Sequence, residues 1–120
     1  GEVYAYRTAD DFARSYDWRK TGLPSDSIDS AFIPPALRAV WPQRVGIAYG
    51  VYNLPFPTAR QTMTPRIMRS TLENALRQAD RYVWYYTYGH NWLIPGNMPR
   101  CWVEAVEGAR AAVGVPTGED

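Results

Sequence analysis

Aromatic and polar residues gather in a short stretch of the second half of the chain. Tyr86, Tyr88, His90, Asn91 and Trp92 follow one another closely in the sequence. Tyr and Trp rings present an apolar face together with a polar group, so they can stack on a sugar ring or a base. His and Asn side chains can hydrogen-bond to hydroxyl groups or base edges. We therefore predict that these residues bind a substrate.

The same residue types also have structural interpretations. Tyr and Trp on a strand more often pack in a core than bind a ligand, and Asn side chains often stabilise turns. His90 is the only histidine, and a lone loop histidine more often lies at the surface than in a catalytic site. Both interpretations of these residues, substrate binding and structural packing, therefore remain open.

Catalysis by hydrolysis of a glycosidic bond normally needs two carboxylates. Most acidic residues occupy predicted helices or caps, whereas Glu2 precedes a possible strand end at residues 3–6. Glu2 is thus the single candidate catalytic carboxylate, and a solvated N-terminal residue is the alternative. One His and one Cys, Cys101, cannot form a zinc site by themselves. We expect no metal and no cofactor.

Two predicted strands must position these residues. Residues 44–52 alternate larger and small side chains with no charge after Arg44, which predicts a strand buried on both faces, as in a parallel sheet. Residues 81–88 form a second strand that is uncharged after Arg81. Ligands of parallel α/β folds bind beyond the carboxyl ends of the strands, so Tyr52 and Asn53 join the substrate-binding candidates.

Helices are predicted to follow both strands. Thr64 and Pro65 are a favourable cap and first residue, and the apolar stripe that follows reaches about residue 79, with Glu73 and Arg77 as an ion pair. Residues 99–113 form the next helix, which Gly114 ends. The alternation predicts an α/β fold of parallel strand–helix units. Two strands alone do not make a stable sheet, so we expect another protein chain or further copies to complete it.

The first 43 residues contain one clear helix. Thr8 is a good N-cap, Asp10 and Asp11 suit the first turn, and Gly22 suits the end. Shorter helical pieces are expected at residues 26–32 and 35–40, interrupted by prolines.

Composition restricts the possible partners. The net charge of +1 gives no electrostatic reason to expect nucleic acid, and no apolar run approaches the roughly 20 residues that cross a bilayer. We expect neither nucleic acid nor membrane as a partner. The single cysteine leaves the compartment open.

Residues 76–92, with the sequence LRQADRYVWYYTYGHNW, resemble the last strand of bacterial glycoside-hydrolase-like TIM-barrel proteins. Residues 1–6 and 16–20 are similar to the region around an earlier strand of the same proteins. The resemblance implies that residues 1–115 are the C-terminal portion of a (β/α)8 barrel, which needs roughly 250 residues in all. Residues 116–120 follow the last predicted helix, and we expect them to be a disordered tail. The family pattern has a glutamate directly after Thr87, where this chain has Tyr88. That departure removes a carboxylate from the rim.

Two functional hypotheses follow. The first is a carbohydrate-active protein, a glycoside hydrolase or its C-terminal portion, which binds sugar on an aromatic rim and uses Glu2 as a catalytic carboxylate. The second is a non-catalytic binding or structural module whose aromatic residues pack in a core or against a partner chain. Exposure of Trp92 on a concave rim would favour the first hypothesis, and burial beneath a helix would favour the second.

Overall fold

The computed structural model describes residues 6–21, 33–52, 63–87 and 89–115. The expected strand end at 3–6, apart from Tyr6, lies outside these residues, as do the helical piece at 26–32 and the tail at 116–120. The described elements, in chain order, are α1 (Ala9–Thr21), α2 (Pro35–Arg38), α3 (Trp41–Arg44), β1 (Tyr49–Tyr52), α4 (Pro65–Gln78), β2 (Val83–Tyr86) and α5 (Arg100–Val113).

The predicted N-terminal caps of α1 and α4 are confirmed. The backbone N–H of Asp11 donates to Thr8 Oγ1 over 3.2 Å, and the Thr8 N–H donates back to Asp11 Oδ2 over 3.0 Å. The Thr8 N–H, together with the Arg7 N–H, holds the pKa of the Asp11 carboxyl below its usual value by donating to it. At α4, Thr64 Oγ1 accepts from the Ile67 N–H over 3.3 Å, and Pro65 is the first helical residue. Gly114, with φ of 72°, ends α5 as predicted.

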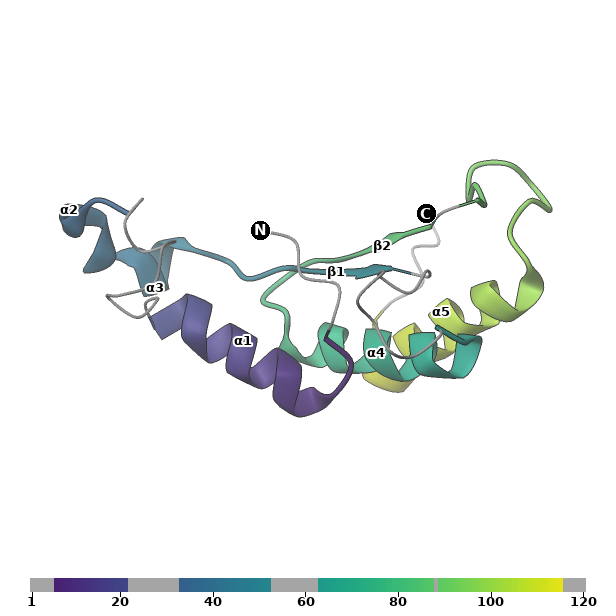
Figure 1. The fold of residues 1–120 in the computed structure, drawn as a ribbon, viewed down its shortest axis with the longest axis horizontal. Coiled ribbons are helices and arrows are strands. Elements are labelled where there is room, and N and C mark those ends of the chain that lie inside the picture. Colours follow the sequence, from purple (N-terminus) through teal and green to yellow (C-terminus); the bar gives the residue numbers. More distant parts are fainter. Residues whose placement is uncertain (1–5, 22–32, 53–62, 88, 116–120) are drawn as a thin grey trace.

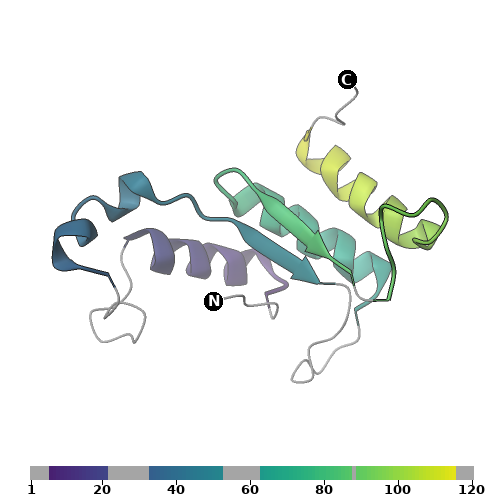
Figure 2. The ribbon, with the colours of Figure 1, turned by 90° about the horizontal axis from the view of Figure 1, so that it is seen from above.

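The strands β1 and β2 pair in parallel, as the sequence predicts. Their register places Tyr49 beside Val83 and Tyr52 beside Tyr86. The helix α4 connects the two strands and runs antiparallel beneath them, with α1 and α5 on either side of it (Figure 2). Mixed helices and strands with a small parallel sheet are an α/β arrangement, and the described elements form two layers (Figure 1).

The first strand begins later than predicted. The helix α3 ends at Arg44, the first residue of the expected strand, and regular pairing begins only at Tyr49. The physical reason is the side chain of Asp80, whose Oδ2 accepts the Ile47 N–H over 2.7 Å. The Asp80 N–H in turn donates to the Ile47 carbonyl over 2.9 Å, and Lys20 Nζ donates to the Val45 carbonyl over 2.6 Å. The Asp80 carboxylate, the Asp80 backbone N–H and the Lys20 ammonium thus satisfy backbone groups that a longer strand would have paired.

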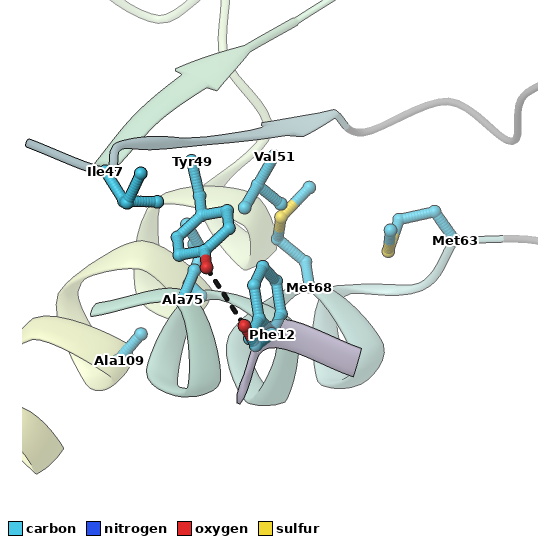
Figure 3. Packing of buried hydrophobic residues seen from close by; sticks show 9 residues of the cluster. Phe12, Ile47, Tyr49, Val51, Met63, Met68, Ala75 and Ala109 are labelled. Atoms are coloured by element: carbon cyan, nitrogen blue, oxygen red, sulfur yellow. Dashed lines mark hydrogen bonds between the residues drawn. The ribbon is translucent and has the colours of Figure 1, made fainter. Parts of the chain in front are cut away.

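The hydrophobic core lies between the sheet and the helices. Tyr49 and Val51 of β1 point toward Phe12 of α1 and Met68 of α4, and all four are at most 5% exposed (Figure 3). The Tyr49 hydroxyl donates to the Phe12 carbonyl over 3.0 Å, which ties β1 to α1. On the far side of α4, α5 buries Ala105 and Ala109.

The prediction that both faces of the sheet are buried is wrong. The helices α1, α4 and α5 all lie on one side of the strands (Figure 1). On the other side Trp84 is 43% exposed and Tyr86 is 52% exposed. The prediction rested on the uncharged side chains that both strands present on their two faces. In the described part of the chain, helices cover only one face of the sheet. None of the described helices is long and apolar enough to cross a membrane.

Candidate binding face of the sheet

Four residues on the uncovered side of the sheet form what we call the aromatic face: Gly50 and Tyr52 of β1, and Trp84 and Tyr86 of β2. The register places Gly50 beside Trp84 and Tyr52 beside Tyr86, and partners in a parallel sheet point to the same side. The Tyr52 and Tyr86 rings lie with centroids 5.0 Å apart, tilted by 34°. Tyr52 is half-buried, whereas Tyr86 is exposed.

Gly50 is the reason that the Trp84 indole can lie flat against the sheet. A Cβ atom at position 50 would come within 2.5 Å of Trp84 Nε1 and 2.6 Å of Cε2. The missing side chain therefore provides the space that the indole occupies. The small residues of the first predicted strand indicated a close approach by another layer. In the structure the approaching group is the aromatic side chain of the neighbouring strand.

Trp92 lies apart from the aromatic face. Its ring contacts Tyr85 edge-on, with centroids 5.4 Å apart and an interplanar angle of 73°. Tyr85 alternates with Trp84 and Tyr86 along β2, so it faces the helix layer. Its hydroxyl is buried without a hydrogen-bond partner among the described residues, and burial raises its pKa. Trp92 is 38% exposed, neither fully displayed on a rim nor enclosed beneath a helix.

His90 and Asn91 help to build the loop that follows β2. Thr87 Oγ1 donates to the His90 carbonyl over 2.8 Å. Asn91 Oδ1 accepts from the Leu93 N–H over 2.8 Å, and the Asn91 N–H donates to Asn97 Oδ1. The turn-stabilising interpretation of Asn91 therefore describes its hydrogen bonds within this loop. The predicted binding residues are thus not on one surface. Tyr86 lies on the aromatic face, Trp92 packs against the helix-facing Tyr85, and His90 and Asn91 take part in hydrogen bonds within their own loop.

Three predicted site residues lie outside the described part of the chain: Glu2, Asn53 and Tyr88. The structure brings Tyr52 and Tyr86 together and separates both from Trp92. Trp84 is not among the predicted substrate-binding residues, although the family resemblance implies it as a candidate rim residue. In the structure it shares the aromatic face with Tyr86, with which it alternates along β2.

The aromatic face contains no charged side chain, and its neighbourhood offers no carboxylate from the segments after the strands. The sequence of residues 53–63 and 87–99 contains neither Asp nor Glu. Among the described residues no group of three His, Cys, Asp or Glu side chains could hold a metal ion. The chemistry that this face can perform by itself is stacking and apolar packing, with tyrosine hydroxyls as hydrogen-bonding groups.

Comparisons of the chain with protein-family models, with curated proteins and with solved structures find no match.

Proposed function

We propose that this chain is a non-catalytic binding module whose aromatic face packs against another protein chain, most simply a second copy of itself. The observation that supports this best is the exposure of Trp84 and Tyr86 on the side of the sheet opposite all three long helices. Parallel sheets are nearly always covered on both faces. Large exposed apolar patches on a protein surface typically mark interaction sites.

Two further observations favour a protein partner over a small ligand. Leu93 is 90% exposed and Ile94 is 52% exposed in the loop after β2. Aliphatic side chains of this kind bury well in a protein interface, whereas sugars stack on aromatic rings. The Cα radius of gyration is 16.2 Å, compared with about 13.6 Å for a compact domain of this length. The chain is thus more extended than a self-contained domain with a complete core.

Carbohydrate binding is the second candidate, because the aromatic face presents several rings side by side. The Trp84 indole lies against Gly50, and the Tyr52–Tyr86 pair continues the same surface. Such a surface suits the apolar face of a sugar ring, with the tyrosine hydroxyls available for its hydroxyl groups. The hydrolase form of this proposal depends on Glu2 and on a second carboxylate, since the segments after the strands provide none.

Light scattering over a range of protein concentrations tests the first proposal. We expect particles heavier than the 13.6 kDa chain, and we expect Trp84→Arg or Tyr86→Arg to return them to single chains. A charge buried in an apolar interface without a partner is strongly unfavourable. Leu37→Arg is the matched control, because Leu37 is a 51% exposed apolar residue on α2, remote from the sheet.

A single-chain particle at every concentration would reject self-association. The wild type and Trp84→Ala would then be titrated with soluble glucan, xylan and chitin oligosaccharides by calorimetry. Binding that Trp84→Ala abolishes would establish the carbohydrate candidate. Absence of both association and sugar binding would contradict both self-association through this face and the carbohydrate candidate. Loss of hydrolysis in Glu2→Gln, with binding retained, would be the specific result expected of the hydrolase form.

A further inference from the structure

A polar pocket lies at the opposite end of the strands from the aromatic residues. Its volume is about 480 Å³, and its walls come from the segments that immediately precede β1 and β2, together with Lys20 near the end of α1. This volume falls within the range of about 300–1,000 Å³ that is usual for small-molecule sites. Nothing in the proposed function of the aromatic face uses this pocket.

Asp80 supplies the one carboxylate in the pocket wall, and this carboxylate already accepts three hydrogen bonds from the protein. Asp80 accepts from the Tyr16 hydroxyl over 2.8 Å, from Lys20 Nζ over 2.9 Å and from the Ile47 N–H over 2.7 Å. Lys20 is likewise engaged, because its ammonium also donates to the Val45 carbonyl. The charges of Lys20 and Asp80 therefore neutralise each other within the wall.

Two arginines supply the remaining charge. Arg44 and Arg81 both line the pocket and are exposed. Within the described part of the chain, neither guanidinium takes part in a hydrogen bond or an ion pair. The pocket thus carries two positive charges that no group among the described residues balances, although the whole chain has a net charge of only +1.

We propose that this pocket binds an oxyanion group of a small molecule, a phosphate or a carboxylate, between Arg44 and Arg81. Each guanidinium presents a planar fork of N–H donors that matches two oxygens of such a group. Gln43, beside Arg44 in the wall, adds an amide donor. Because the net charge of the chain is small, the attraction comes from this local arrangement rather than from a generally basic surface.

Gly46 keeps the pocket open. It lines the wall, and a Cβ atom there would meet the Asp80 side chain only at 4.0 Å, which is ordinary contact. A larger side chain at this position would therefore project into the pocket without changing its charge. A substitution at position 46 therefore distinguishes binding inside the pocket from non-specific electrostatic attraction to two surface arginines.

The test is a titration of isotope-labelled protein, followed by backbone amide resonances. Inorganic phosphate and succinate are the probes, each compared with sodium chloride at equal ionic strength. We expect saturable shifts at the amides of Gly46, Ile47 and Arg81, and the tighter probe identifies which oxyanion the site prefers. Arg44→Gln and Arg81→Gln should each weaken binding about tenfold, as expected for loss of a charge-assisted hydrogen-bonding pair.

Arg100→Gln is the matched control, because Arg100 is an exposed arginine at the start of α5 that pairs with Glu104. It removes the same charge and should leave binding unchanged, whereas Gly46→Leu should weaken binding while retaining every charge. Thermal unfolding of each variant checks that it is folded. Non-saturable shifts, shifts matched by chloride, or equal losses in Arg100→Gln and the two pocket variants would overturn the proposal.

Discussion

Asp80 joins three parts of the chain that are distant in sequence. Its carboxylate binds Tyr16 and Lys20 of α1 and the backbone of Ile47, which leads into β1. The Ile47 N–H, followed by Lys20 and Tyr16, lowers the pKa of the Asp80 carboxyl to about 2. The same side chain thus determines where β1 begins and holds α1 at the amino end of the sheet.

We predict that Asp80 makes stability fall on acidification. Because its pKa is lower in the folded chain than the ordinary value of 3.8, the stabilisation is complete above about pH 4 and is lost as the pH falls toward 2. Urea unfolding of Asp80→Asn at a series of pH values should show a smaller loss over this interval than the wild type. Glu107→Gln, an exposed change on α5, is the control, and an unchanged slope in Asp80→Asn would contradict the assignment.

Gly50 and Trp84 should be energetically coupled. The Gly50→Ala methyl group would overlap the indole, so we expect a destabilisation of about 1–3 kcal/mol, or displacement of Trp84. In a Trp84→Ala background the same change should be neutral or stabilising by about 0.5–1 kcal/mol, since alanine loses less conformational freedom than glycine. A double-mutant cycle by chemical denaturation measures the coupling, and strict additivity would show that the indole does not lie over Gly50.

Among the elements, α4 organises the fold. It connects the two strands, packs beneath them, and separates α1 from α5 (Figure 2). Its buried face consists of Met68, Thr71, Leu72 and Ala75, which recur at helical spacing. The hydrophobic pattern of this helix was sufficient to predict its buried side.

Met68→Ala tests whether α4 is the centre of the core. Met68 is fully buried, so the lost side chain leaves a cavity, and we expect a destabilisation of about 2–5 kcal/mol. Leu37→Ala removes an apolar side chain on α2 that is 51% exposed and remote from the sheet, and it should change stability by no more than about 0.5 kcal/mol. Equal effects of the two changes in urea unfolding would rule out the packing described for α4.

Charge pairing along α4 was predicted less well than its packing. The sequence predicts an ion pair between Glu73 and Arg77, but Glu73 pairs with Arg69 over 2.9 Å. Arg77 instead donates to the Ala112 carbonyl at the end of α5 over 3.4 Å. Both arginines lie within reach of Glu73 on a helix surface. The choice between them depends on the neighbouring helix, which local spacing does not specify.

For the whole molecule, the main feature is a sheet with one face that no described helix covers and with two edges that no other described strand pairs. In a parallel ladder successive amides point alternately to opposite sides of a strand. The Tyr49 N–H donates to the Tyr82 carbonyl across the sheet, so the Gly50 N–H points to the outer edge of β1. The same alternation directs the Tyr85 N–H to the outer edge of β2.

Hydrogen exchange should report how a partner covers the sheet. We expect the Tyr49 amide to be protected at every protein concentration, because its hydrogen bond lies within the chain. If a second copy adds to an edge as well as to the face, the Gly50 or Tyr85 amide should become protected as the particle mass rises. Rapid exchange of both in an associated particle would restrict the contact to the aromatic face.

The sequence by itself determined the three long helices, the N-terminal caps of α1 and α4, and the parallel pairing of two strands, but not the short helix α3. Capping residues, hydrophobic periodicity and strand–helix alternation are local properties, and they act through hydrogen bonds and side chains close in sequence. Tertiary structure alone decided which residues share a surface. Contacts between distant segments decide the side to which Trp92 packs, the late start of β1 beside the Asp80 carboxylate and the grouping of Arg44 with Arg81. A uniformly uncharged strand likewise does not specify which of its faces the helices cover, because both faces are equally apolar.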